Sequence, residues 1–425
     1  MTLSFDDINQ GLMSFIDDSP TAFNCVANIC SLLTKAGFER LSEKDEWNIK
    51  KGSKYFVVRN DSSIIAGVIN DPSDNKGFNI VASHSDSPGF SLKPGSEISE
   101  NGYIKLNTNG YGGMILYSWL DRPLSLAGRV VIKDDDGFKS EIIHIDQDLL
   151  VIPSQAIHIN REVNDRNNLN PQVDLLPIIG LADKTGQVKE LLANYVNYQS
   201  VCDYDLFLYT RAKATYVGIN NEFIVSPRLD NLACAYNSLM AFLTCDDAST
   251  NRIYCCFDSE EIGSLTQNGA DSTFLNDFII RSCEAMKVSV YPVLSRSFLV
   301  SADNGHALHP NAATKSDLTN KVKLNEGVVI KHHVNYTTNA LTSSVFKDIC
   351  DKAKVKWQDF TCRSDMRNGS TLGGISLSHV SVSSVDIGLP QLAMHAAVET
   401  MGASDSLFIY QALKEFYKTS INIKM

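Results

Sequence analysis

Long hydrophobic runs are missing from this 425-residue sequence. No apolar stretch reaches the roughly 20 residues that a helix needs to span a bilayer. The first residues, Met1 to Asp7, also lack the basic segment followed by an apolar one that is typical of a secretory signal. We therefore expect a cytoplasmic protein with no membrane partner.

The cysteines lack the spacing of a metal-binding or disulfide framework. All ten are scattered, none forms a C-x-x-C pair, and several, such as Cys30, Cys234, Cys255 and Cys256, lie in apolar stretches. This usage is typical of reduced core cysteines in a cytosolic protein. We expect buried thiols.

Positive charge is scarce as well, because 38 Lys and Arg stand against 49 Asp and Glu, a net charge of -11. Such a surface repels phosphate groups, so nucleic acid and anionic membranes are poor candidate partners. Hydrophobic content of 44% and charged content of 20% are ordinary for a globular protein. The length exceeds that of a usual single domain, so we expect two.

The most informative stretch runs from Arg252 to Ser264. Ile253 to Phe257 is an unbroken apolar run rich in β-branched and aromatic residues, which predicts a strand buried on both faces. Asp258, Glu260 and Glu261 follow, at the strand end where open α/β sheets place their ligands. Two adjacent glutamates cannot point the same way, so one can bind a cation while its neighbour faces a water.

Four other segments place a metal-ligand residue type beside a buried strand or a helix start. These are His84 after the strand at 78–83, Asp230 before the helix at 231–244, Asp303 after the strand at 298–301, and His395 after the strand at 385–388. Asp86, two residues after His84, is placed to orient the imidazole. Each has a plain structural alternative, such as a simple turn at His84 or a helix N-cap at Asp230.

Together with Glu261, these residues make five candidate ligands. Five exceed what one tetrahedral zinc with an open position needs, but they suit two ions that share a bridging carboxylate. Two ions roughly 3.5–4 Å apart clamp an attacking water and polarise a carbonyl together. The pattern therefore favours hydrolysis of an amide or an ester.

The rhythm of the chain predicts an α/β fold with an insertion. A helix with Ser19 as N-cap and Gly37 as C-cap precedes strands at 55–59 and 63–69, and the α/β rhythm returns after residue 226. Between them lie short alternating segments and a hairpin at 130–145. We predict an α/β domain with a mixed sheet flanked by helices (1–94 and 226–425) that carries the candidate ligands, and an inserted, mainly β domain (95–225) that serves assembly rather than chemistry. His158, in an apolar segment of the insertion, is either a hydrogen-bonded core histidine or a functional residue.

Five motifs, in this order, resemble those of the aspartyl aminopeptidase family of di-zinc metallopeptidases. They are His84-Ser-Asp-Ser-Pro, Arg228-Leu-Asp-Asn-Leu, Asp258-Ser-Glu-Glu-Ile-Gly-Ser, Ser301-Ala-Asp-Asn-Gly-His-Ala-Leu-His-Pro-Asn and Ile387-Gly-Leu-Pro-Gln-Leu-Ala-Met-His. The similarity extends nearly from end to end. The chain departs from the family's usual Met-Ala at Asn304-Gly305 and from its usual Arg-Asn-Asp at Arg363-Ser364-Asp365.

The resemblance implies a metal site built on Asp230, which would bridge two divalent ions, zinc in the first place and cobalt or manganese as alternatives. His84 and Asp303 would complete one site, and Glu261 and His395 the other. Glu260 would be the general base that takes a proton from the attacking water and returns it to the leaving amine. Asp86 would orient His84.

The resemblance also implies the substrate side and the assembly. His306, Lys331 and Tyr336 would contact the peptide, together with His158 from a neighbouring subunit. Members of the family form dimers through the inserted domain and commonly assemble into dodecamers, so we expect a homo-oligomer.

The family's preference for peptides with acidic (Asp or Glu) N-termini requires a cation near the substrate side chain. Lys331, followed by His332 and His333, is the best local candidate, and a solvated lysine at a strand end is the alternative. Two other functions stay open. One is a related di-metal hydrolase, either a broad-specificity aminopeptidase or a deacylase, and the other is a non-catalytic assembly protein of the same fold.

Overall fold

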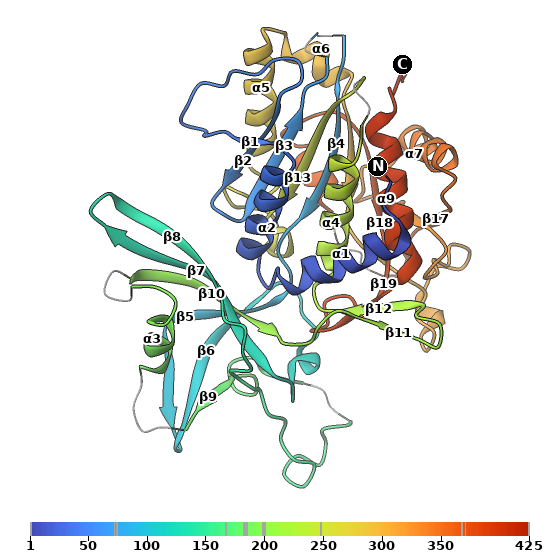
Figure 1. Cartoon of the computed structure of the whole chain (residues 1–425). Helices are drawn as coiled ribbons and strands as arrows, with labels where there is room; N and C mark the ends of the chain where they lie inside the picture. The colour runs from blue at the N-terminus through green and yellow to red at the C-terminus, as the bar shows by residue number, and fades with distance from the viewer. Residues whose placement is uncertain are drawn as a thin grey trace.

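The computed structural model describes residues 2–71, 73, 75–165, 168–181, 186–197, 201–246, 249–366, 369 and 371–423. Its largest element is a nine-stranded mixed sheet (Figure 1). In spatial order the strands are β1 (Glu39–Arg40), β2 (Lys54–Arg59), β3 (Ser63–Val68), β13 (Asn251–Phe257), β4 (Phe78–His84), β14 (Phe298–Ala302), β18 (Ser383–Gly388), β16 (Val328–Lys331) and β17 (Trp357–Phe360). The four central strands, β13, β4, β14 and β18, run parallel to one another.

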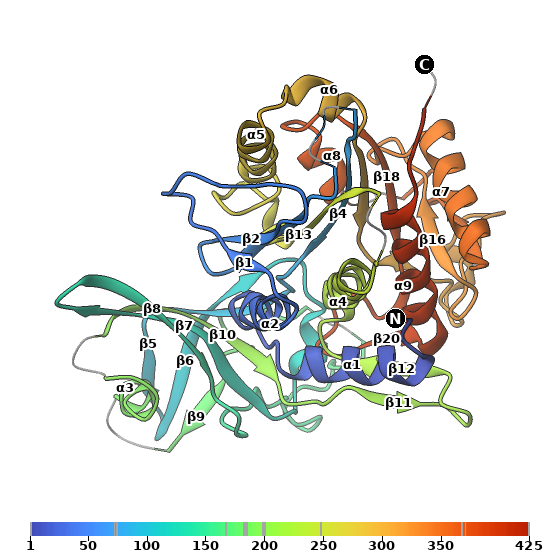
Figure 2. The same cartoon turned by 45° about the horizontal axis from the view of Figure 1, so that its top comes forward.

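Helices cover both faces of this sheet, because its central strands are apolar on both sides and every residue of β4, β13 and β14 is buried. One face carries α1 (Phe5–Asp17), α2 (Ala22–Lys35), α4 (Leu229–Leu243), α7 (Ala340–Ala353) and α9 (Ala403–Lys418). The other carries α5 (Phe274–Met286), α6 (Val290–Ser295) and α8 (Leu372–Ser376), as Figure 2 shows from a second direction. The predicted α/β class with a mixed sheet between helices is confirmed.

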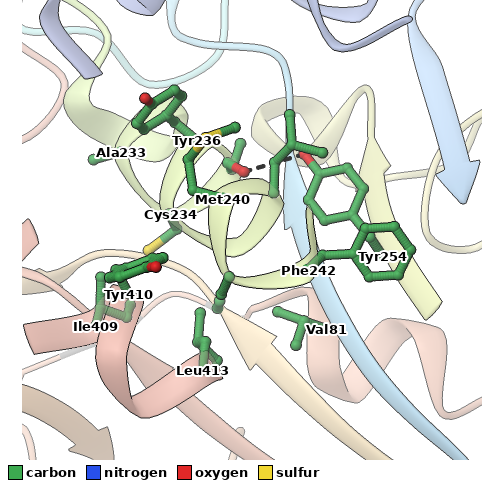
Figure 3. Close-up of a cluster of buried hydrophobic side chains, with 14 of the residues drawn as sticks. Val81, Ala233, Cys234, Tyr236, Met240, Phe242, Tyr254, Ile409, Tyr410 and Leu413 are labelled. Atoms are coloured by element: carbon green, nitrogen blue, oxygen red, sulfur yellow. Dashed lines mark hydrogen bonds between the residues drawn. The ribbon is translucent and has the colours of Figure 1, made fainter. Parts of the chain in front are cut away.

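Helix α4 lies at the centre of the larger core (Figure 3). Its side chains pack in one cluster with Val81 of the sheet and with Ile409 and Leu413 of α9. The hydroxyl of Tyr254 donates a hydrogen bond to the carbonyl of Ala235 over 3.2 Å. At the start of α4, the amide of Asn231 donates to the carbonyl of Ala302 at the end of β14 over 2.9 Å, so the helix begins beside the carboxyl ends of the central strands.

A second sheet projects from the first, and Figure 1 shows it at the lower left. Its six strands are, in spatial order, β8 (Gly137–His144), β7 (Leu124–Asp134), β10 (Val201–Thr210), β5 (Gly89–Glu100), β6 (Tyr103–Tyr111) and β9 (Ile178–Gly180). The short helix α3 (Gln187–Leu192) packs on it through Val188 and Leu192. The predicted hairpin is β7 and β8, and the strands of this sheet run from Gly89 to Thr210. The division at residues 95 and 225 stays a prediction.

A third sheet has five strands, and through its strands β11 (Thr215–Val217) and β12 (Phe223–Ser226) the chain passes from the second sheet back towards the first. Its strands are, in spatial order, β11, β12, β20 (Glu399–Gly402), β19 (Pro390–Leu392) and β15 (Gly305–His306). Short 3-10 turns occur at η1 (Leu116–Trp119), η3 (Glu260–Ile262) and η4 (Ala313–Lys315). Among the described residues, no helix has the length and apolar character needed to cross a membrane.

One predicted helix boundary is corrected by the structure. Helix α2 begins two residues later than predicted, because the N-cap is Thr21, whose hydroxyl accepts the N–H of Asn24, and Ser19 lies outside the helix. Gly37 does follow the helix end in the left-handed conformation, with φ of 81°.

Candidate metal centre

Three parallel strands end side by side at the centre of the first sheet. β13, β4 and β14 are adjacent, and Phe257 at the end of β13 lies opposite His84 at the end of β4. His84 is the last residue of β4, Glu260 and Glu261 follow β13, and Asp303 follows β14. Strand order therefore brings together residues that are far apart in the sequence, as expected for a ligand site in an open α/β sheet.

The carboxylate of Asp230 lies between the two predicted histidine ligands. Its Oδ1 is 3.7 Å from Nε2 of His84, and its Oδ2 is 3.5 Å from Nε2 of His395. Asp230 is not the N-cap of α4, because Arg228 occupies that position and the carboxylate of Asp230 faces the histidines instead. One oxygen faces each histidine, which is the arrangement that a bridging carboxylate needs.

The other two predicted acidic ligands, Asp303 and Glu261, each lie beside one of the histidines. Oδ1 of Asp303 is 3.6 Å from Nε2 of His84, and Oε1 of Glu261 is 3.3 Å from Nε2 of His395. Three groups have the right spacing for a metal ion. Two of them contain the predicted ligands: a first group of His84, Asp230 and Asp303, and a second group of Asp230, Glu261 and His395. The third consists of His84, Glu260 and Glu261. The structure thus brings together all five predicted ligands, in the two sets that the resemblance implies.

Each histidine is held by its other ring nitrogen. Nδ1 of His84 lies 3.0 Å from the carbonyl oxygen and 3.3 Å from Oδ1 of Asp86. Nδ1 of His395 lies 3.0 Å from the carbonyl oxygen of Gly113. When Nδ1 donates a hydrogen bond to these oxygens, the imidazole is neutral and Nε2 carries no proton. The lone pair of Nε2 can then bind a metal.

Asp86 also fixes the backbone of the two glutamates. Its carboxylate accepts the N–H of Glu260 over 3.2 Å and that of Glu261 over 3.1 Å, and the hydroxyl of Tyr111 donates to it over 2.8 Å. Burial acts to raise the pKa of Asp86, but the hydrogen bond with His84 and the neighbouring donors hold it below its ordinary value. Asp86 therefore stays ionised.

The acidic side chains make this site a place of concentrated negative charge. Although burial opposes protonation of His395, its contacts with Asp230 and Glu261 raise its pKa to about 11. Oδ1 of Asp230 is buried and has no hydrogen-bond partner among the described residues. Carboxylate oxygens and imidazole nitrogens are ligand atoms that zinc uses in catalytic sites. These residues therefore fit divalent metal ions.

A family model described as "Aminopeptidase I zinc metalloprotease (M18)" matches residues 15–417. The chain belongs to the M18 family. It is a metalloaminopeptidase, and zinc is the metal in the family's description. The predicted resemblance is confirmed, since the aspartyl aminopeptidase family is the M18 family. The alternative of a non-catalytic protein is set aside.

Relatives and solved structures agree with this assignment over nearly the whole M18 chain. The "Probable M18 family aminopeptidase 2" of Clostridium novyi (strain NT) is 43% identical over 421 residues, which cover 96% of this chain and 97% of that protein. A structure described as "Cryo-EM structure of the Ape4 and Nbr1 complex" is 35% identical, has a TM-score of 0.93 and covers 98% of this chain and 88% of its own. "Crystal structure of prApe1" is 25% identical, has a TM-score of 0.93 and covers 98% of this chain and 94% of its own.

In this M18 aminopeptidase, Lys331 ends strand β16 but is buried. The alternative of a solvated lysine at a strand end is therefore wrong. Its Nζ is 3.4 Å from Oδ2 of Asp303 and 5.8 Å from the ring centre of Tyr336. Burial would lower its pKa, but Asp303 raises the pKa of Lys331 above its ordinary value, so the ammonium stays charged. Lys331 therefore lies near both Tyr336 and the carboxylate of the candidate ligand Asp303.

His306 faces a pocket of about 280 Å³ next to the metal centre. Residues of β15, η4, the 360–366 segment and β19 line it. Its charged side chains and histidines are His306, His309, Lys315, Asp317 and Arg363. The departure at Asn304 does not change this pocket directly. Its buried amide donates to the carbonyl of Leu229 over 2.8 Å and to Gln391 over 2.6 Å.

His158 is the one predicted site residue that the chain does not place near the centre by itself. It is exposed in a turn of the second domain, so the interpretation as a core histidine is wrong. Figure 1 shows the segment that follows β8 extending away from the first sheet. Within a single chain, His158 remains outside the candidate metal centre.

Three residues at the site were not anticipated from the sequence. Tyr111 and Gly113, from the predicted insertion, contact Asp86 and His395 as described above, so the second sheet takes part in building the site. Glu399 is buried and accepts the N–H of Asp230 over 3.0 Å and that of His395 over 2.7 Å. A sequence signal existed only for Glu399, an acidic residue four positions after His395.

Proposed function

We propose that this M18 aminopeptidase removes the N-terminal residue of peptides with two divalent ions, most simply zinc, held by His84, Asp230, Glu261, Asp303 and His395. The observation that carries the proposal is the carboxylate of Asp230, whose two oxygens face different histidines at 3.7 and 3.5 Å. When bound, such a pair of ions polarises the scissile carbonyl and activates a water. The general base and the substrate contacts are proposed to come from the chain's own residues.

Glu260 is the proposed general base. Its carboxylate lies in the same group as His84 and Glu261, and its backbone N–H is fixed on Asp86. Burial, followed by the charges of Asp303 and Glu261, raises the pKa of Glu260 to about 8 against the opposing effect of His84. A carboxylate with a raised pKa can take a proton from the attacking water and return it to the leaving amine near neutral pH.

The proposed preference for acidic N-termini has support in the pocket beside His306. Lys315 and the two histidines contribute positive charge or hydrogen-bond donors, whereas the carboxylate of Asp317 already accepts the N–H groups of Thr319 and Asn320. Lys331 adds a buried ammonium next to Tyr336. A substrate carboxylate would find cationic partners here that offset its desolvation.

We further propose a homo-oligomer in which the second domain, residues 95–225, brings His158 to a neighbouring subunit. The exposure of His158 and of the apolar Ile157 and Ile159 beside it supports a contact surface at this turn. A dimer would let the residue reach the partner's substrate, and a dodecamer built from such dimers is the assembly expected from the family resemblance.

A substrate panel tests the reaction and its specificity. Purified protein supplied with zinc is assayed on peptides with N-terminal Asp, Glu, Leu and Ala and on N-acyl amino acids, with the metal content measured on the same sample. We expect two ions per chain and the highest kcat/KM on Asp and Glu. Equal rates on Leu and Ala would contradict the acidic preference, and turnover confined to N-acyl amino acids would favour the deacylase alternative.

Glu260→Gln tests the proposed base. The variant should keep its fold and its metal, while kcat falls by roughly 10²–10⁴-fold, because the amide cannot accept the proton. Steady-state rates and metal analysis of the same preparation measure both effects. Turnover near that of the wild type would remove Glu260 from the mechanism.

A further inference from the structure

Glu399 connects two predicted ligands that lie far apart in the sequence. Its Oε2 accepts the backbone N–H of Asp230 over 3.0 Å, and its Oε1 accepts that of His395 over 2.7 Å. The residue is 2% exposed. Both oxygens of one carboxylate thus accept hydrogen bonds from the backbone of the two predicted ligands.

Both backbones have conformations that regular structure would not maintain. His395 is left-handed, with φ of 66°, a region that residues other than glycine seldom adopt. Asp230 departs from helical angles at the start of α4. Hydrogen bonds from a fixed acceptor can hold such segments in place, and Glu399 is itself fixed, because β20 pairs with β12 through Ser226 and Glu399.

The second of the two ligand groups depends on this contact more than the first. Asp230, Glu261 and His395 form the second group, and Glu399 holds the backbone of two of its three members. In the first group, His84 and Asp303 have other supports, namely Asp86 and Lys331. The loss of Glu399 would therefore affect the two groups unequally.

We propose that Glu399 is a positioning residue that sets the distance between Asp230 and His395 and thereby the affinity of the second metal site. The inference rests on the ligand assignment of the proposed function. It requires a carboxylate at this position, because the amide of glutamine offers one acceptor oxygen and directs an NH2 group at the other N–H.

Glu399→Gln and a matched control test this role. Asp405 is also a buried carboxylate that accepts two backbone N–H groups, from Asn325 over 2.7 Å and from Gly327 over 3.3 Å, outside the ligand groups. Asp405→Asn therefore repeats the chemical change elsewhere. Metal-free wild type and both variants are titrated with Co²⁺ alone, and the visible absorption of the bound ion and the melting temperature are recorded.

We expect the wild type to bind two ions, and Glu399→Gln to bind one of them about 10- to 100-fold more weakly, as expected for loss of an outer-shell partner. The absorption of the weakened site should also shift. Asp405→Asn should bind both ions as the wild type does, even if its melting temperature falls equally.

Three results would overturn the inference. The first is wild-type affinity at both sites in Glu399→Gln, and the second is an equal loss of affinity in Asp405→Asn. The third is failure of both Glu399→Gln and Glu399→Asp to fold, because Glu399 would then serve the fold rather than the metal site. A wild type that binds no pair of ions would refute the proposed ligand assignment itself, so the wild-type titration separates that failure from the others.

Discussion

At the scale of single residues, Asp230 shows how one side chain can serve two neighbours. Its two carboxylate oxygens face different histidines, and both groups of predicted ligands include it. The backbone supports this placement, since Glu399 accepts its N–H and the side chain of Ser87 donates to its carbonyl over 2.9 Å. A residue that only capped helix α4 would not need these contacts.

Replacing Asp230 with Ala should empty both metal sites. The change removes the only carboxylate shared by the two groups and leaves two ligands on each side, too few for tight binding. Metal analysis after dialysis measures the result, with Asp405→Asn as the control for loss of a buried carboxylate. Two retained ions per chain would contradict the bridging role.

Asp405 predicts a dependence of stability on pH that is separate from catalysis. Burial raises its pKa to about 8, whereas an aspartate in the unfolded chain titrates at about 3.9. Between these values the folded state binds a proton that the unfolded state has lost, so this contribution to stability is present at low pH and disappears as the pH rises towards about 8.

Asp405→Asn should remove this contribution, because an amide does not titrate. The melting temperature of the variant relative to the wild type should therefore increase from about pH 5 to about pH 8. Thermal unfolding of both proteins over this range measures the difference. A difference that stays constant with pH would show that Asp405 does not titrate in this way.

At the scale of elements, the segment from Tyr111 to Ser118 links the second sheet to the metal centre. Tyr111 donates to Asp86, the carbonyl of Gly113 faces His395, and the N–H of Ile115 donates to the carbonyl of His395 over 2.9 Å. Gly112, with φ of 70°, packs where a Cβ would lie 3.1 Å from Cβ of Glu261. A larger residue would push this segment away from the ligands.

Tyr111→Phe should lower kcat/KM by about 10- to 100-fold, the usual cost of losing an outer-shell hydrogen bond. The hydroxyl is lost while the aromatic packing on Phe207 is kept. Tyr117→Phe is a matched control, since Tyr117 lies on the same segment and is 58% exposed. Equal kinetics for both variants would mean that the contact with Asp86 does not affect catalysis.

At the scale of the whole molecule, the position of His158 makes the oligomer part of the proposed site. The residue is exposed on the second domain, and the candidate metal centre lies at the carboxyl edge of the first sheet. If His158 acts on the neighbouring subunit's substrate, two inactive chains can complement each other within a symmetric dimer.

Mixing His158→Ala with Glu260→Gln, after dissociation and reassembly, should restore activity. In a mixed dimer one site combines the Glu260 of one chain with the His158 of the other, so random pairing would leave roughly one site in four intact. Steady-state rates before and after mixing measure the gain, with each variant alone as its control. A mixture no more active than its components would place the action of His158 within its own chain, or outside catalysis.

The sequence by itself determined the class of the fold and the residues of the candidate centre. A buried strand that is followed closely by Glu260 or Asp303 is a local pattern, and the order and spacing of residues within each motif can be read from that motif alone. Only the tertiary structure decided which of these ends meet, because the strand order β13, β4, β14 pairs segments that are distant in the chain. The same reason explains the contact of Tyr111 with Asp86, that of Glu399 with Asp230, and the burial of Lys331 beside Asp303, since a contact between distant segments leaves no signal in either segment alone.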